Sequence, residues 1–302
     1  MIKGFRIDRN DGRIYAMGAT AVSGGVHFSF ASKGEACAVV FYRKGAGSPK
    51  GRIRFPANAR TGDVWSMTVL GDFSGLEYVY EVDGQQVPDP YGRRFTGMER
   101  WGSPVRLEKP VRTPVDTEGS AYDWEEDVLP CIPYDQCVIY HIHPRGFTKH
   151  VSSGVEGDSR GTFKGVAEKI PYLKDLGITT VEMMPPVEFE ELIIPERVDG
   201  SPFAAEKPDG KLNYWGYTRG YYFAPKCAYS SGPVRQPERE FKDMVKALHK
   251  AGLELVLELF FDGKEAPSYV LDVVRFWAQE YHVDGVRLVG YAPVKLLGED
   301  PY

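Results

Sequence analysis

The sequence predicts a multidomain chain of two fold classes: an all-β, immunoglobulin-like β-sandwich, followed by an α/β part that forms the first half, about four strands, of a TIM (β/α)8 barrel. Two observations indicate this division. Through residues 1–100, short apolar segments alternate with turn residues at a spacing of roughly ten residues, which is typical of a sandwich. From residue 137 onwards, apolar strands alternate instead with helical patterns, which is typical of βαβ units.

The N-terminal strands show the period of two that is expected of a half-buried sheet. Val26, Phe28 and Phe30, for example, alternate with polar residues. The predicted strands are residues 24–32, 36–42, 51–55, 64–70 and 76–84. Pro88 and Pro90 end the pattern, because proline cannot donate a hydrogen bond within a central strand.

Residues 101–136 are irregular and rich in Pro, Asp and Glu, and we interpret them as a linker. Residues 137–302 then alternate strand and helix. The predicted strands are 137–143, 178–186, 253–261 and 285–290, and the predicted helices are 161–177, 238–252 and 268–282. Because a complete barrel needs about 250 residues, we expect either a piece of a longer protein or an open sheet that self-associates through its edges.

Composition excludes several classes of function. A net charge of −5 with interleaved acids and bases predicts no nucleic-acid partner. Neither an N-terminal apolar segment nor a long apolar run is present, so we expect no signal peptide, no membrane span and a cytoplasmic location. The four cysteines lack a C-x-x-C pair and are predicted to be buried thiols.

Metal and cofactor sites are not predicted. His141 and His143 are two residues apart and would share one face of a strand. Such a pair could bind a metal, but no acidic or thiol residue lies near it in the sequence. We therefore expect no metal and no cofactor.

Four segments carry a resemblance to a known family. They are "LEYVYEVDGQQVPDPYG", "VIYHIHPRGFTKH", "GTFKGVAEKIPYLKDLGITTVEMMPPVEF" and "NYWGYTRGYYFAPKCAYSS", in that order. The chain resembles, over nearly its whole length, the pullulanase, isoamylase and glycogen-debranching group of the α-amylase clan (glycoside hydrolase family 13), with an N-terminal carbohydrate-binding module of the family 48 type. The resemblance implies an α-glucan partner and a retaining mechanism, with an aspartate nucleophile after the fourth strand, a glutamate acid after the fifth and a second aspartate after the seventh.

The sequence departs from the motifs that this resemblance implies. The fourth-strand motif, D-G-F-R-F-D, is matched by residues 284–289, so Arg287 is retained but the nucleophile position holds Val289. The third-strand motif, D-V-V-x-N-H, is matched by residues 258–263, with Glu258, Asp262 and Gly263 at substituted positions. The fifth and seventh strands would lie beyond the last residue. The resemblance therefore implies a chain with no intact catalytic residue.

Three functional hypotheses remain open at this point. The chain is an active α-1,6- or α-1,4-glucan hydrolase in its full-length form, a catalytically inactive glucan binder, which we favour, or a non-catalytic assembly module. Stacking on sugar and packing of the loop are equal alternatives for Tyr217, whereas packing is favoured for Tyr214 and Trp215. Arg287 needs an acidic partner, and Glu258 is the predicted one. Trp65, Tyr78 and Tyr80 are predicted to be core residues rather than a carbohydrate platform.

Overall fold

The computed structural model describes residues 4–8, 17–103, 111–116, 122–192 and 211–300. The chain divides into two compact units. The first, here called the β unit, comprises residues 1–98 and 105–121, and the second, the α/β unit, comprises residues 99–104 and 122–302. In the part of the chain that the structure describes, no helix is long and apolar enough to cross a membrane.

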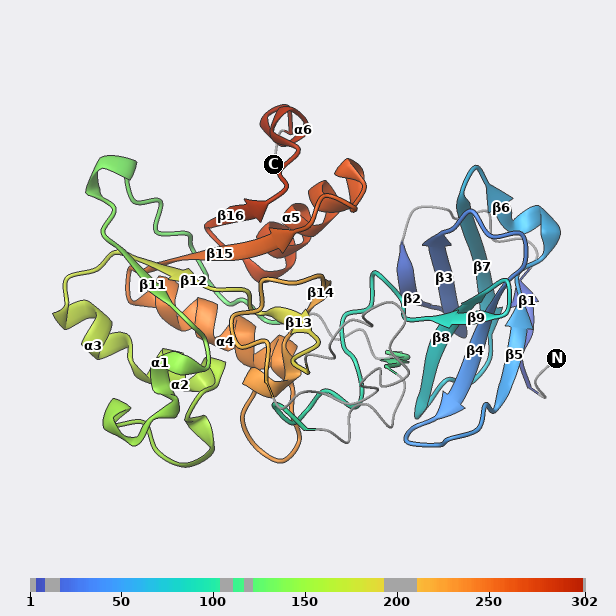
Figure 1. Ribbon diagram of the computed structural model, residues 1–302, viewed down its shortest axis with the longest axis horizontal. Helices are drawn as coiled ribbons and strands as arrows, with labels where there is room; N and C mark the ends of the chain where they lie inside the picture. The colour runs from blue at the N-terminus through green and yellow to red at the C-terminus, as the bar shows by residue number, and fades with distance from the viewer. Residues whose placement is uncertain (1–3, 9–16, 104–110, 117–121, 193–210, 301–302) are drawn as a thin grey trace, which may run out of the picture. The chain divides into compact units, whose positions relative to one another are not determined.

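The β unit is built from two antiparallel sheets of five strands each (Figure 1). The first sheet has the order β1 (Arg6–Asp8), β7 (Val64–Leu70), β3 (Gly25–Ala31) and β2 (Gly18–Val22), with β6 (Arg60–Thr61) paired to β7. The second has the order β10 (Thr113–Pro114), β8 (Leu76–Val82), β4 (Cys37–Arg43) and β5 (Gly51–Arg54), with β9 (Gln85–Val87) paired to β8.

One hydrophobic core joins side chains from both of these sheets. Aromatic rings dominate it; Phe28 of β3, for example, lies edge-on to Tyr78 of β8 at 5.2 Å between ring centroids. Trp65, Tyr78 and Tyr80 are all buried, so the prediction that they are core residues is confirmed. Every aromatic side chain of the described part of the β unit is at least partly buried. A sugar-stacking surface therefore has to be sought elsewhere in the described chain.

The α/β unit contains a four-stranded parallel sheet in the order β11 (Ile139–Ile142), β12 (Thr180–Met183), β15 (Glu254–Phe261) and β16 (Gly285–Gly290). A separate, two-stranded antiparallel sheet consists of β13 (Val187–Phe189) and β14 (Gly220–Pro225). The helices are α1 (Gly146–Lys149), α2 (Phe163–Glu168), α3 (Ile170–Asp175), α4 (Pro237–Lys250), α5 (Pro267–Tyr281) and α6 (Val294–Gly298). Short 3-10 turns cover Ala57–Ala59, Tyr134–Gln136, Val151–Ser153, Gly157–Ser159 and Cys227–Tyr229.

The two faces of the parallel sheet differ in chemistry. One face is apolar and fully buried, and α4 packs against it. Its side chains on the two central strands are Val181, Met183, Leu255, Leu257, Leu259 and Phe261. Since successive side chains of a strand point to opposite faces, the residues between these positions lie on the other face, which carries the charged side chains of the candidate site.

Three details differ from the expectations. The helix predicted over 161–177 is two helices, α2 and α3, because Pro171 has no N–H for a continuous helix and occupies the first turn of α3 instead. Cys37 and Cys227 are buried as predicted, but the prediction is wrong for Cys131, which is exposed, and for Cys137, which is half-buried. Both lie in the Pro-rich segment 130–137, which forms no regular layer that could cover them.

Within the segment predicted as a linker, residues near the start pair with the β unit and residues further along contact the α/β unit. Thr113 and Pro114 form β10 and pair with β8 of the β unit. Further along, the hydroxyl of Tyr122 donates a hydrogen bond of 2.6 Å to Asp243 of α4 in the α/β unit.

Candidate functional site

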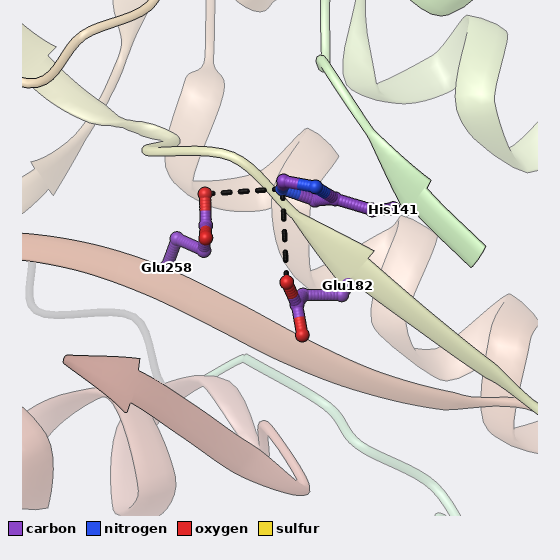
Figure 2. Close-up of side chains that lie close together, drawn as sticks. All are labelled: His141, Glu182 and Glu258. Atoms are coloured by element: carbon purple, nitrogen blue, oxygen red, sulfur yellow. Dashed lines mark hydrogen bonds and ion pairs between the residues drawn. The ribbon is translucent and has the colours of Figure 1, made fainter. Parts of the chain in front are cut away.

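The polar face of the parallel sheet gathers four ionisable side chains, one from each strand. His141 of β11 is in register with Glu182 of β12, and Glu258 of β15 is in register with Arg287 of β16. Glu258 is two residues beyond Val256, which is the register partner of Glu182, so all four side chains point to the same side of the sheet. Figure 2 shows His141, Glu182 and Glu258 converging from their three strands.

Arg287 joins the two carboxylates of this cluster. Its Nη1 donates a hydrogen bond of 2.7 Å to Glu182 Oε1 and lies 3.0 Å from Glu258 Oε1. The predicted ion pair between Arg287 and Glu258 is therefore present, and Glu182 is a second acceptor. The hydrogen bond that Arg287 donates to Glu182, and the charges of both carboxylates, raise the pKa of Arg287 above its ordinary value.

Glu258 is the most connected and most buried member of the cluster. Besides Arg287, its Oε2 lies 3.0 Å from Nε2 of His141 and accepts a hydrogen bond of 2.7 Å from the hydroxyl of Tyr217. Burial, together with this bond, raises the pKa of Tyr217 to about 12. Tyr217 therefore stays a neutral donor at physiological pH.

His141, Glu182 and Glu258 also form the set of donors in the described chain that could hold a metal ion, with their ligand atoms within 4.8 Å of one another. The expectation that His141 has no acidic neighbour is wrong, because the neighbours come from adjacent strands rather than from the adjacent sequence. One imidazole and two carboxylates would suit zinc or another transition metal. The guanidinium of Arg287 already supplies positive charge to both carboxylates, so we interpret the cluster as a hydrogen-bonded ionic network.

His143 does not share the environment of His141. It follows the end of β11, is buried, and stacks on Tyr214 with 4.2 Å between ring centroids. Its Nδ1 accepts hydrogen bonds from the amides of Arg145 and Gly146, while its Nε2 lies 2.7 Å from the carbonyl of Tyr214. Burial lowers the pKa of His143, and these partners fit a neutral ring that carries its proton on Nε2.

Val289 lies on the same polar face, two residues after Arg287 and in register with Phe260. An isopropyl group has no electron pair with which to attack an anomeric carbon. Beyond the end of β15, Asp262 lies 3.4 Å from Arg219 and 3.6 Å from Lys264. The amide of Lys264 and the charge of Arg219 lower the pKa of Asp262, so this carboxyl is ionised and cannot act as a general acid at neutral pH.

The side chains of the aromatic loop, residues 214–217, differ in their exposure to solvent. Tyr214 packs against His143, as favoured, and also lies edge-on to Trp101. Trp215 is 53% exposed, more than Tyr217 at 38%. Gly263, which the sequence resemblance matches to a histidine, has a positive φ of +85°, a backbone conformation that disfavours a larger side chain.

Sequence reasoning missed the placement of His141 beside Glu182, Glu258 and Arg287. The signal that could have found it is the register of four parallel strands, because residues on the same face of adjacent strands become neighbours. That register depends on how far each strand slides relative to the next, which the spacing along the chain does not specify.

A β unit of two antiparallel sheets followed by a parallel sheet with helices is the order of parts that the resemblance to glycoside hydrolases predicted. Comparisons with known proteins agree, although no family model matches the chain. It is 30% identical over 344 residues to isoamylase 1 of Oryza sativa subsp. japonica, covering 90% of this chain and 41% of the isoamylase. It is also 30% identical over 306 residues to the glycogen debranching enzyme of Yersinia enterocolitica, covering 78% of this chain and 44% of that enzyme.

Solved structures show the same fold. The pullulanase of Paenibacillus barengoltzii, crystallised with maltohexaose and α-cyclodextrin, superposes with a TM-score of 0.71 at 22% identity, covering 92% of this chain and 48% of the pullulanase. The chain spans less than half the length of these relatives. Its relatives in sequence are thus isoamylases and glycogen debranching enzymes of glycoside hydrolase family 13, so the predicted resemblance to this group is confirmed. The pullulanase shares its fold.

Proposed function

We propose that this chain binds α-glucan without hydrolysing it. In this proposal the β unit corresponds to the immunoglobulin-like, family 48 type of carbohydrate-binding module, and the parallel sheet corresponds to the first four strands of the (β/α)8 barrel. Support comes from the homologous debranching enzymes and from the pullulanase fold. The position of Val289 is the single observation that carries the catalytic part of the proposal.

A retaining glycosidase needs two carboxyl groups about 5 to 5.5 Å apart, one ionised as the nucleophile and one protonated as the acid. Val289 cannot serve as the first. Glu258 is not a ready substitute, because its two oxygens already face Arg287, His141 and Tyr217. Asp262 is held ionised beside Arg219.

We predict that the purified chain releases no reducing sugar from pullulan or glycogen above the level of the heat-denatured protein. A Val289→Asp variant is expected to remain inactive, because it restores a nucleophile without a positioned acid. A glycogen debranching enzyme assayed in parallel shows that the substrates are cleavable. Release of sugar that disappears in a Glu258→Gln variant would contradict the proposal and favour the alternative, an active α-1,6- or α-1,4-glucan hydrolase.

The binding part of the proposal is carried by the exposed aromatic loop. Trp215 presents a half-exposed indole, and Tyr217 is fixed by its bond to Glu258. Sugar rings present apolar C–H faces that pack well on such planes. Two of the similar solved structures are complexes, one with maltohexaose and α-cyclodextrin and the other with maltotetraose, which supports an α-glucan as the ligand.

We expect Trp215→Ala to weaken retardation of the chain in a glycogen-containing gel by about tenfold or more, since covering a large side chain contributes about 1.5 to 3 kcal/mol and 1.4 kcal/mol corresponds to a factor of ten. Tyr134→Ala is the matched control, because Tyr134 is another strongly exposed aromatic residue that lies outside the loop. Equal retardation of all three proteins would remove Trp215 from the binding surface.

The same gel separates a second candidate, an assembly module. Val138 and Ile139 are each 51% exposed at the edge strand β11, and exposed apolar edges promote strand pairing between chains. A chain that sediments as a dimer and shows no retardation by glycogen would favour assembly over glucan binding.

A further inference from the structure

A polar pocket lies in the α/β unit, among residues of α1 and of the loops that precede α2 and α4. It has a volume of about 260 Å³. Four basic side chains line it, namely Arg145, Lys149, Arg160 and Arg235, together with one acidic side chain, Asp158. None of these residues belongs to the ionic network around Glu258 or to the aromatic loop.

The backbone brings the basic residues together from separate segments. Arg145 and Lys149 lie at the two ends of α1, and the amide of Lys149 donates to the carbonyl of Arg145 at 3.1 Å. Gly161 allows their side chains to approach the loop after Arg160, because a Cβ at position 161 would lie 3.0 Å from Lys149 Cδ and 3.3 Å from Arg145 Cγ. Gly161 also has a φ of +76°, which favours glycine.

The acids near these cations do not form ion pairs with three of them. Among the residues that the structure describes, Arg145, Lys149 and Arg160 form no ion pair. Arg145 lies over the ring of Trp101 at 5.2 Å, and Arg235 donates to the carbonyl of Ser230. The nearby acid Glu191 already pairs with Lys226 at 2.6 Å.

The electrostatic consequence is mutual repulsion across the pocket. Burial, followed by the charges of Arg145, Arg160 and Arg235, lowers the pKa of Lys149. Burial also lowers the pKa of Arg145. Tyr229, Tyr214 and Glu191 act in the opposite direction, and the charge of Arg235 acts in the same direction as burial. Like charges held at close range are a cost that a bound anion would relieve.

We propose that this pocket binds a phosphate dianion, either the free ion or the phosphate group of a sugar monoester. Guanidinium groups match the oxygen geometry of phosphate, and lysine adds a point charge. The cavity is smaller than the 300 Å³ or so at which pockets for drug-sized ligands begin, which fits a compact anion. A carboxylate carries half the charge of the dianion and would leave more of the repulsion uncompensated. The inference does not depend on the proposed glucan function.

The test is isothermal titration calorimetry of the whole chain with sodium phosphate and with glucose 6-phosphate, at low ionic strength and pH 7.5, with glucose as the uncharged control. We expect saturable binding that weakens as salt is added, because salt screens exposed charges. The double variant Lys149→Gln/Arg160→Gln is expected to weaken binding at least tenfold. Asp158→Asn, which removes the one acid of the pocket, is expected to tighten it.

Lys164→Gln is the matched control, because Lys164 is exposed on α2 and does not line the pocket. Arg145→Lys, which keeps the charge, provides a milder variant should the double variant unfold. Tighter binding of glucose 6-phosphate than of phosphate would assign the pocket to sugar phosphates, and the reverse order would assign it to the free ion. The absence of saturable binding, or equal affinity in wild type and the folded charge-removing variants, would overturn the proposal.

Discussion

Replacing Lys226 with methionine is expected to lower the free energy of unfolding by about 3 to 5 kcal/mol, the usual cost of removing one partner from a buried ion pair. Lys226 is fully buried and directly follows β14. Its Nζ lies 2.8 Å from Glu188 Oε1 and 2.6 Å from Glu191 Oε1, and donates to the carbonyl of Phe189 at 2.9 Å. Methionine has a similar length but would leave two buried carboxylates without a cation.

The ionisation state of Glu188 explains why the expected decrease in unfolding free energy is large. Burial raises the pKa of Glu188, while Lys226 acts in the opposite direction and favours the ionised carboxylate. Once the lysine is removed, two backbone amides still stabilise that charge, those of Cys227 at 2.8 Å from Oε2 and of Phe189 at 3.3 Å from Oε1, but no cation does. The aromatic loop lies between β13 and β14 in the sequence, and Glu191 connects to its start, because the carbonyl of Glu191 accepts a hydrogen bond of 2.7 Å from the amide of Asn213. Glucan binding is therefore expected to weaken along with stability.

Urea denaturation at pH 7 measures this effect. Lys250→Met is the control, because Lys250 is an exposed lysine at the end of α4, and such surface changes are usually within about 0.5 kcal/mol. The double variant Lys226→Met/Glu188→Gln is expected to recover part of the loss, since it removes one of the two uncompensated charges. If the single and double variants were equally destabilised, the ion pair would not be the cause.

Asp127→Ala is expected to lower the free energy of unfolding by about 3 kcal/mol, because Asp127 accepts from two histidines and a hydrogen bond to a charged group contributes about 1.5 to 3 kcal/mol. The buried carboxylate lies 2.9 Å from Nδ1 of His249 and 2.8 Å from Nδ1 of His282. Nε2 of His249 lies 3.0 Å from Asp284, which also accepts from the amide of Leu255. These hydrogen bonds connect residues 122–127 to α4 and to His282, the residue that follows α5.

The same network predicts a dependence on pH. Burial opposes protonation of His249, but Asp284 and Asp127 outweigh it, so the pKa of His249 lies above its ordinary value of 6.5. The folded state therefore binds this proton more tightly than the unfolded state. The resulting stabilisation is fully present below about pH 6.5 and is lost as the pH rises through the pKa of the folded state.

Urea titrations of the wild type and Asp127→Asn between pH 6 and pH 9 test this expectation. The difference in unfolding free energy between the two proteins is expected to be largest at pH 6 and to shrink towards pH 9, because only the wild type holds the full charge partner of His249. Asp175→Asn, at an exposed aspartate of α3, is the control. A difference that stays constant over this range would show that His249 is not the titrating group.

Much of the fold could be predicted because its elements bury continuous or periodic apolar patterns. Residues 238–252 and 268–282 were predicted as helices and form α4 and α5. Both keep apolar side chains at helical spacing against the core. The short strands β1, β6, β9 and β10 have only two or three residues each, which is too few for a period of two to be recognised.

Only part of the site could be predicted from the sequence. Motif positions led to Arg287, Val289 and Glu258, and the need of a guanidinium for an acid led to the pair with Glu258. The second acceptor, Glu182, and the neighbour His141 depend on strand register, which is set by packing across the whole sheet. In the same way, His249 gave no signal, because its partners Asp127 and Asp284 are 122 and 35 residues away in sequence.

The ion pairs of Arg287 with Glu182 and Glu258 determine how the fold tolerates substitution at position 289. An arginine that depended on an acid at position 289 would be left uncompensated by valine, and selection for folding alone would then preserve the acid. Here both of its partners come from other strands, so folding places no demand on the chemical identity of residue 289. Position 289, which the sequence resemblance matches to a nucleophile, can therefore vary without disturbing these ion pairs, and a side chain that lacks a carboxylate is compatible with this fold.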